Sequence, residues 1–443
     1  MKLWEKDSIP LQEVDRFTVG KDREMDIHLA AFDVLGSIAH AQMLESVGLL
    51  SKPDRVALEK ELRSIFNQVK KGEFRLADDA EDIHSQVEQL LTQKLGDTGK
   101  KIHSARSRND QVLVDIRLFL RDELEEIVKA VVELFALLQQ QSEKYKDQLL
   151  PGYTHLQLAM PSSFGLWFGS YAESITDDTI TIKAAFDIVN QNPLGSAAGY
   201  GSSFPIDREM TTRLLGFASL SYNSVYAQMG RGKTERIVAM ALANLADTLA
   251  RLATDACLFM NENFGFISFP EELTTGSSIM PHKKNPDVFE LIRAHCNRLR
   301  SLPNTILMMT ANLPSGYHRD LQLLKEELFP AFRVLKDCME MTGLMLSKIK
   351  IRSNILEDDK YKYLFSVEEV NRLVSGGIPF RDAYKKVGQD IASGNFNPTQ
   401  SIHHTHAGSI GNLCSGEIKA KMQTIINSFP FSAIRSALQK LVE

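Results

Sequence analysis

The sequence predicts an all-α protein built around a bundle of long helices. Two long stretches contain no glycine or proline and carry apolar residues at every third or fourth position, which is the period of a helix. Alternating patterns typical of β-strands are nearly absent, so we expect at most small hairpins. At roughly 150 residues per domain, the 443 residues favour about three domains.

The longest helix is expected over residues 109–150, where Leu113, Ile116 and Leu120 begin an apolar stripe that continues to Leu138. At ~1.5 Å per residue such a helix extends on the order of 60 Å. A small domain cannot cover a helix of that length. We therefore expect the helix to lie in a bundle shared between subunits.

Further bundle helices are expected over three stretches of the same period. They are residues 234–263, about 286–302, and a helix that continues toward residue 351 with Pro330 in its first turn, where proline is tolerated. Stretches rich in proline, glycine and serine predict the loops between them, over residues 192–205, 270–281 and 313–317.

Shorter helical segments flank this bundle, broken by glycines and prolines such as Gly48, Pro53 and Gly376. The sequence therefore predicts three domains. These are an N-terminal helical domain over residues 1–105, a central long-helix bundle over 106–355, and a small helical C-terminal domain over 356–443.

The composition excludes several classes of protein. With 51 Lys and Arg against 56 Asp and Glu, the net charge is −5, so a nucleic acid or a membrane surface is not an expected partner. The four cysteines lie far apart without a CxxC pair, which argues against a disulfide framework and a zinc site and fits a reducing cytoplasm. Residues 1–7 are charged and lack the apolar core of a signal peptide, and no uninterrupted apolar run approaches ~18 residues.

Three look-alike motifs fail on their context. The run 232–234 (GKT) ends like a phosphate-binding loop, but Ala227 stands where the first glycine is required and no strand precedes it. Gly195, Gly199 and Gly201 are spaced wrongly for a dinucleotide fingerprint. The nearby histidines His403, His404 and His406 have no partner carboxylate or cysteine at metal-ligand spacing. We therefore expect neither a cofactor nor a metal.

The strongest motif covers residues 274–287, with the sequence TTGSSIMPHKKNPD. A glycine precedes paired hydroxyls, then come Lys283 and the amide of Asn285, and a helix is expected to begin near Pro286. Hydroxyls and backbone N–H groups beside a lysine and a helix N-terminus can hold a carboxylate or a developing oxyanion. The motif predicts an anion site, whereas the plainer alternative is a polar loop leading into a helix.

Residues 276–285 (GSSIMPHKKN) resemble the signature of the fumarase/aspartase superfamily, whose members eliminate across a C–N or C–O bond and release fumarate. The stretches 103–112 (HSARSRNDQV), 151–157 (PGYTHLQ) and 313–325 extend the resemblance over essentially the whole chain. These three stretches favour a member of the superfamily that breaks a C–N bond to a guanidino group. The resemblance implies a cofactor-free homotetramer in which three subunits contribute to each site.

The resemblance also implies catalytic roles that the chemistry supports. Ser277 would act at the carbon proton, with Lys283 lowering the pKa of its hydroxyl. His155 would move a proton, and Glu290 would orient and stabilise its imidazole. Lys283 and Asn285 would hold the extra negative charge of the carbanion. Which of Ser277 and His155 is the acid and which the base depends on the direction of the reaction.

Substrate contacts follow from the same resemblance. Asn109 and Thr154 would meet the succinate end, with Arg108 and Arg236 as carboxylate clamps, because arginine suits bidentate pairing. The remaining candidates are Ser107, the site-lining pair Asp82 and His84, and Tyr317, Gln322 and Lys325 at the amino-acid end of the second product.

Several alternatives stay open. Arg236 could instead form an ion pair on a helix surface, and His84 could be a buried structural histidine. At the level of function, the rivals are another fumarate-releasing lyase, such as an adenylosuccinate lyase, and a non-catalytic crystallin-like protein. Three stretches depart from the superfamily pattern. Trp4 is followed by Glu-Lys-Asp in place of the usual Gly-Gly-Arg-Phe, residues 17–24 contain no clean match to a substrate-contacting serine, and 228–233 (QMGRGK) replace a Ser-Met-Asp run.

Overall fold

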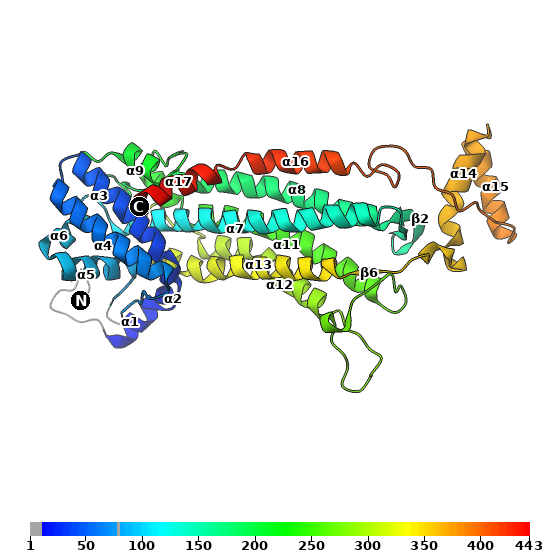
Figure 1. Ribbon diagram of the computed structural model, residues 1–443, viewed down its shortest axis with the longest axis horizontal. Helices are drawn as coiled ribbons and strands as arrows, with labels where there is room; N and C mark the ends of the chain where they lie inside the picture. The colour runs from blue at the N-terminus through cyan, green and yellow to red at the C-terminus, as the bar shows by residue number, and fades with distance from the viewer. Residues whose placement is uncertain (1–10, 78–79) are drawn as a thin grey trace.

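The computed structural model describes residues 11–77 and 80–443, so the charged segment over residues 1–7 lies outside it. The expected all-α class is confirmed. Figure 1 shows an elongated molecule in which long helices run parallel to the long axis, with short helices gathered around the N-terminal part at one end.

Five long helices form the bundle. They are α7 (Arg108–Lys144), α8 (Phe164–Val189), α11 (Lys233–Met260), α12 (Asp287–Met309) and α13 (Leu324–Ser347). Their facing stripes are buried; on α7, for example, Leu120, Leu124 and Leu138 are inaccessible to solvent. Burial of such a stripe, rather than intrinsic propensity, supplies most of the stability of a helix in a protein.

The structure corrects three of the expected helix boundaries. The first helix ends at Lys144, because Leu149 and Leu150 pair with Ser163 and Ser162 in a hairpin. The third continues through Pro303 to Met309. The fourth begins at Leu324, so Pro330 lies inside it and not in its first turn.

Sequence analysis did not identify α8. Its fully buried residues Phe164, Phe168, Ile175 and Phe186 lie on one face of the helix, but the opposite face also carries apolar side chains such as Ile180, which is 46% exposed. With apolar residues on both faces, the sequence carries only a weak amphipathic signal.

Shorter helices complete the two ends of the chain. On the N-terminal side are α1 (Gln12–Val19), α2 (Asp22–Asp26), α3 (Ala30–Ser46), α4 (Lys52–Lys70), α5 (Ile83–Leu95) and α6 (Asp97–Lys100). Between α8 and α11 lie α9 (Arg208–Leu214) and α10 (Ser224–Met229). The C-terminal part contains α14 (Ser366–Ser375), α15 (Phe380–Ala392), α16 (Ser415–Asn427) and α17 (Phe431–Val442).

The C-terminal helices divide into two groups. A small separate core of Val370, Leu373, Ala383, Val387 and Phe396 holds α14 and α15 together at the far end of the molecule. By contrast, α16 packs along α8, and α17 returns to α3 and α9 (Figure 1). The three-domain division at residues 105/106 and 355/356 remains a prediction.

The strands are short, as expected. β1 (Leu149–Thr154) and β2 (Gln157–Ser163) form an antiparallel hairpin, and β5 (Ile267–Ser268) pairs antiparallel with β6 (Lys350–Ile351). β3 (Gln191–Asn192) and β4 (Ser219–Leu220) pair in parallel. Each ladder braces a connection between bundle helices.

Two helical stretches, Asp22–Ser46 and Lys233–Met260, are long and apolar enough to pass a simple test for membrane spans. Their most apolar windows are 72% and 61% buried inside the protein. Such burial is the property of core helices, for which the same composition serves packing.

Candidate active site

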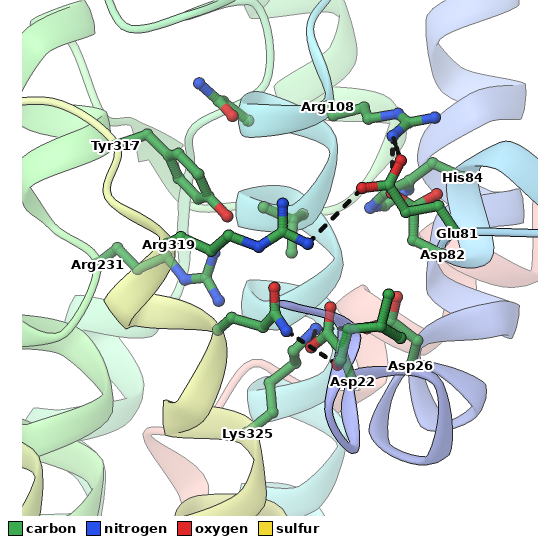
Figure 2. A pocket seen from close by; sticks show the side chains of 14 residues that line it. Asp22, Asp26, Glu81, Asp82, His84, Arg108, Arg231, Tyr317, Arg319 and Lys325 are labelled. Carbon is green, nitrogen blue, oxygen red and sulfur yellow. Dashed lines mark hydrogen bonds and ion pairs between the residues drawn. The ribbon is translucent and has the colours of Figure 1, made fainter. Parts of the chain in front are cut away.

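A cavity of about 250 Å³ opens where the N-terminal end of α7 meets α2, α5 and the start of α13. Its walls are mostly charged, as Figure 2 shows. The lining residues are Val19, Asp22, Asp26, Glu81, Asp82, His84, Arg108, Asn109, Val112, Arg231, Tyr317, Arg319, Gln322 and Lys325. Seven of the candidate substrate residues therefore come together here: Asp82, His84, Arg108, Asn109, Tyr317, Gln322 and Lys325.

The first turn of α7 positions Arg108 and Asn109. Ser107 caps the helix, its hydroxyl accepting from the N–H of Asn109 at 3.3 Å, while Asp110 accepts from the N–H of Ser107 at 2.8 Å. This reciprocal capping fixes the turn and satisfies N–H groups that would otherwise lack partners. Ser107 thus holds the two neighbouring residues at the cavity wall and is not itself among the lining residues.

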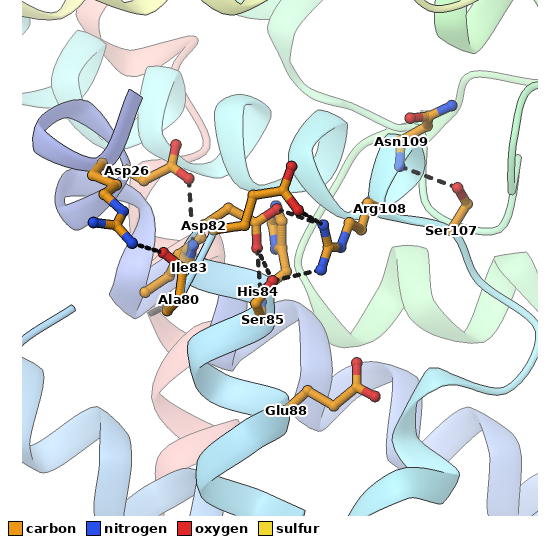
Figure 3. Close-up of polar contacts among 12 residues, drawn as sticks. Asp26, Ala80, Asp82, Ile83, His84, Ser85, Glu88, Ser107, Arg108 and Asn109 are labelled. Carbon is orange, nitrogen blue, oxygen red and sulfur yellow. Dashed lines mark hydrogen bonds and ion pairs between the residues drawn. The ribbon is translucent and has the colours of Figure 1, made fainter. Parts of the chain in front are cut away.

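Arg108 is already engaged within its own chain. Its guanidinium donates to Glu81 at 2.9 Å and to the hydroxyl of Ser85 at 2.5 Å, and it lies 3.3 Å from Asp82 (Figure 3). Asp82 in turn caps α5, accepting from the backbone and the hydroxyl of Ser85. Burial opposes ionisation of Asp82, but the charges of His84 and Arg108 outweigh it and lower the pKa of the carboxyl.

His84 lies in a buried acidic cluster behind this wall. Its Nδ1 is 2.8 Å from an oxygen of Asp33 and 3.5 Å from Asp115. Burial favours the neutral ring, but the hydrogen bond and charge of Asp33, together with Asp115 and Asp82, raise the pKa of His84 to about 9. Burial and the neighbouring Asp33 raise the pKa of Asp115 well above its usual range.

His84, Asp33 and Asp115 offer ligand atoms within 4.8 Å of one another, which is close enough to hold a metal ion. However, Nδ1 of the ring already bonds to Asp33, and a protonated imidazole supplies the positive charge that the two carboxylates require. His84 and Asp33 are therefore hydrogen-bonded to each other, whereas both oxygens of Asp115 are buried without a hydrogen-bond partner. His84 is thus a buried histidine within a structural cluster and also a residue of the cavity wall, so the two alternatives do not exclude each other.

The opposite wall centres on Lys325, which is buried in the first turn of α13 and contacts both Asp22 and Asp26. Burial and the adjacent Asp26 raise the pKa of Asp22 to about 6, although Lys325 and Arg231 act in the opposite direction. Sequence reasoning missed Asp22 and Asp26. Their only sequence signal is acidity within residues 17–26, and their pairing with a lysine about 300 positions later cannot be read from a linear pattern.

Tyr317, Arg319 and Gln322 complete the cavity from the segment before α13. Both Arg319 and Gln322 donate to the carbonyl of Thr18, and Gln322 also donates to the carbonyl of Val19 at 3.1 Å. The end of α1 therefore lies over this side of the cavity. Arg319, like Glu81 and Arg231, was not among the expected site residues.

The structure places the catalytic candidates elsewhere in the same chain. Ser277, Lys283 and Asn285 lie in the loop between β5 and α12, which extends away from the bundle (Figure 1). The loop is closed at its base by a bridge between Thr275 and Asn285. Ser277 accepts from the N–H of Met280 at 3.2 Å, and Lys283 is exposed. At ~1.5 Å per residue, the length of α12 separates this loop from the cavity by roughly 35 Å.

Thr154 and His155 lie at the tip of the β1–β2 hairpin, at the other end of α7 from Arg108. His155 and Leu156 have φ of 53° and 59°, a left-handed conformation that the tight two-residue turn demands and that side chains disfavour. Leu156 is 79% exposed. The tip is a strained, projecting structure, which is characteristic of functional segments.

The remaining two candidates are not in the cavity either. Glu290, in the first turn of α12, is 51% exposed and lies 3.9 Å from Arg293, and among the described contacts it has none with His155. Arg236 lines a neighbouring cavity of about 270 Å³, together with Arg231, Lys233 and His318. The described part of the chain shows no ion pair for Arg236.

A bundle of long helices with a charged cavity at one end and a projecting loop over residues 276–285 is typical of a lyase of the fumarase/aspartase type. The fold is shared with solved structures. Among them are an EDDS lyase in complex with formate (TM-score 0.74, 22% identity, 94% of this chain and 91% of that one) and a class II fumarase from Schistosoma mansoni (TM-score 0.70, 15% identity, 95% and 97%).

Sequence comparison is more specific. Residues 15–300 match the Lyase family, and the chain belongs to that family. It is 62% identical over 441 residues to an argininosuccinate lyase of Phocaeicola vulgatus, covering 100% of this chain and 99% of the relative. It is 40% identical to an argininosuccinate lyase of Thermotoga neapolitana, covering 88% and 98%.

Proposed function

We propose that the protein is a carbon–nitrogen lyase that cleaves argininosuccinate reversibly to L-arginine and fumarate, a step of arginine biosynthesis. The observation that carries this function is the 62% identity to an argininosuccinate lyase over the whole chain. The charged cavity supports it, because its cationic and acidic groups suit a substrate with carboxylates, an ammonium and a guanidinium.

The chemistry requires an acid, a base and a site for negative charge. Removing the proton next to a carboxylate generates a carbanion, and the departing guanidino nitrogen must be protonated. Ser277 and His155 exchange these protons, Glu290 stabilises the imidazolium, and Lys283 and Asn285 hold the carboxylate on which charge accumulates. No redox step or cofactor is needed for this sequence of proton transfers.

The active site is completed by neighbouring subunits of a homotetramer. This part of the proposal is supported by the separation of three groups within one chain: Arg108 and Asn109 at one end of α7, His155 at the other, and Ser277 on a projecting loop. The length of α7, on the order of 55 Å, exceeds the reach of any side chain. Only packing of several chains brings all three groups within reach of one small molecule.

A cytoplasmic location is also part of the proposal. The cysteines Cys257, Cys296, Cys338 and Cys414 are all free thiols, which is the usual state in a reducing compartment. The substrate is a small molecule, and neither a nucleic acid nor a membrane takes part.

The decisive experiment follows fumarate absorbance with four substrates offered separately: argininosuccinate, adenylosuccinate, aspartate and malate. We expect fumarate from argininosuccinate and none from the other three. Release of fumarate from adenylosuccinate alone would contradict the proposal and identify the protein as an adenylosuccinate lyase. An intact tetramer inactive with all four would indicate the crystallin-like, non-catalytic alternative.

A further inference from the structure

An aromatic cluster from three separate segments supports the hairpin that carries His155. The ring of Tyr153, two residues before His155, has its centroid 5.4 Å from that of Phe264. Phe264 stacks on Phe266 at 5.1 Å, and Phe266 lies 6.3 Å from the ring of Tyr361. The cluster therefore joins the hairpin to the segment before β5 and to a 3-10 helix much later in the chain.

The cluster rests on a fixed base. Phe266 is fully buried, its N–H donates to the carbonyl of Phe259 at 2.9 Å, and its carbonyl accepts from the N–H of Arg352 at 2.9 Å. Tyr361 is only 2% exposed, and its helix, η6 (Asp359–Phe365), packs against β2. Figure 1 shows β2 and β6 at the same end of the bundle. Rings packed in a buried interior have little freedom to move, so the cluster can hold the hairpin in place.

The tip of the hairpin has little support of its own. The ladder shifts register between Pro151 and Tyr153, and only two residue pairs lie between that irregularity and the turn. In the turn, His155 and Leu156 adopt a left-handed conformation that side chains disfavour. A two-stranded ribbon is marginally stable by itself in water. Tyr153 is the last residue before the turn that is not exposed, so the position of His155 depends on the contacts of Tyr153.

Tyr361 interacts directly with Tyr153. Burial raises the pKa of Tyr153 to about 12, and the charge and hydrogen bond of the Tyr361 phenol act in the same direction, against the opposing charge of Lys360. Two residues further along η6, Tyr363 stacks at 5.9 Å on Phe396, a member of the small C-terminal core. The helix that presents Tyr361 to the hairpin is therefore itself anchored.

We propose that Tyr361 is a positioning residue for His155: it holds Tyr153 and so fixes the hairpin tip in the orientation from which the imidazole reaches the reacting atoms. This inference rests on the proposed function, in which His155 moves a proton. Tyr361 itself does not touch the substrate. Because the hairpin and the charged cavity lie at opposite ends of α7, loss of this contact should lower turnover and leave binding of L-arginine in the cavity unchanged.

The test compares two variants of Tyr361 in the whole enzyme. Tyr361→Leu removes the ring and should lower kcat by about 10–100-fold, because small displacements of a reacting group have effects of that size. The inhibition constant of L-arginine should change by less than about twofold. Tyr361→Phe keeps the ring and should restore most of the turnover. A purely structural role would lower the melting temperature without separating kcat from L-arginine binding in this way.

A double variant tests whether Tyr361 acts through Tyr153. If both residues hold the tip through one contact, Tyr153→Leu combined with Tyr361→Leu should lower kcat no more than the larger single effect. Multiplied effects in the double variant would overturn the inference, as would an unchanged kcat in folded Tyr361→Leu enzyme. Should the leucine variants fail to fold, the same comparison is made with Tyr153→Phe and Tyr361→Phe, which remove only the hydroxyl groups.

Phe186→Leu is the matched control. Phe186 is fully buried, and its ring packs against Phe429 and Phe431 at 5.4 and 5.3 Å, so its truncation should cost a similar amount of stability. It lies roughly 33 Å along α8 from the hairpin, so kcat should not change. Loss of turnover in this control as well would contradict the inference. A wild-type enzyme without lyase activity, or a fully active His155→Asn variant, would instead overturn the proposed function, and this inference with it.

Discussion

His84 illustrates how burial and charge compete at a single residue. Its ring is 5% exposed and would be neutral in an apolar setting, but three carboxyl groups, from Asp33, Asp82 and Asp115, keep it protonated. The same proton that stabilises the cluster also gives the adjacent cavity wall a positive charge. Stability and charge of the site are therefore linked through one imidazole.

This linkage predicts a pH dependence of stability. The pKa of His84 is raised from 6.5 to about 9, so the folded state binds the proton more tightly than the unfolded state does. The contribution is fully present below pH ~6.5 and is lost as the pH rises toward ~9. His84→Asn should flatten the fall in melting temperature across that range in thermal unfolding. The exposed His403→Asn is the control, and an unchanged slope in His84→Asn would contradict the prediction.

Glu290 offers a test of the proposed acid–base machinery. Glu290→Gln should keep the fold, because the residue is half exposed. Under the shared-site proposal it should lower kcat by about 100-fold, since a neutral amide cannot stabilise the imidazolium of a His155 supplied by another subunit. The measurement is kcat between pH 6 and 9. Glu417→Gln, in the first turn of α16, matches its helix position and should have no effect. Unchanged turnover in Glu290→Gln would reduce Glu290 to a structural residue of α12.

Among the elements, α7 connects the fold to the site most directly. Its 37 residues form one side of the bundle, and its capped first turn presents Arg108 and Asn109 to the cavity. The cap serves stability and the site at once, because the turn that it fixes is the turn that lines the cavity.

Removal of that cap should separate the two effects. Ser107→Ala should lower the free energy of unfolding by about 1 kcal/mol, as does the loss of other serine caps. Ser51→Ala, which removes the cap of α4, should cost a similar amount. Only Ser107→Ala should also raise KM, because α7 lines the cavity and α4 does not. Denaturant unfolding gives the free energy of unfolding of both variants, and steady-state kinetics gives their KM. An equal change of KM in both variants would contradict the idea that the Ser107 cap positions the cavity wall.

At the scale of the whole molecule, the distribution of candidates calls for several subunits. Exposed apolar side chains on the bundle, among them Leu291, Leu307, Met308 and Leu344, leave α12 and α13 with surface for further packing. Exposed apolar side chains on long helices are typical of interfaces between subunits. A tetramer would cover that surface and assemble the site at the same time.

Mixed oligomers test this assembly. Ser277→Ala and His155→Asn chains are each expected to be inactive alone. When they are refolded together in equal amounts, about one quarter of the sites should be active. These sites take Ser277 from a His155→Asn chain and His155 from a Ser277→Ala chain. Fumarate release is compared with that of each variant refolded alone. Tetramers shown to contain both chains yet lacking activity would rule out the shared site.

The local features of the protein could be predicted from sequence. The helix periods identified the all-α class and most of the bundle, and the run 276–285 identified the superfamily, because a helix stripe and a loop motif are properties of neighbouring residues. Seven of the proposed substrate residues line one cavity. Their individual roles remain predictions.

Only the tertiary structure decided the rest. Sequence analysis did not identify α8, because apolar residues on its exposed face, such as Ile180, weaken the contrast with its buried stripe. Nor did it show that Asp22 faces Lys325, or that Arg231 turns inward between two glycines, since these contacts join residues far apart in the chain. Charged site residues follow no periodic pattern along the sequence, unlike the apolar residues of a helix. Which groups they contact is determined only when the chain folds.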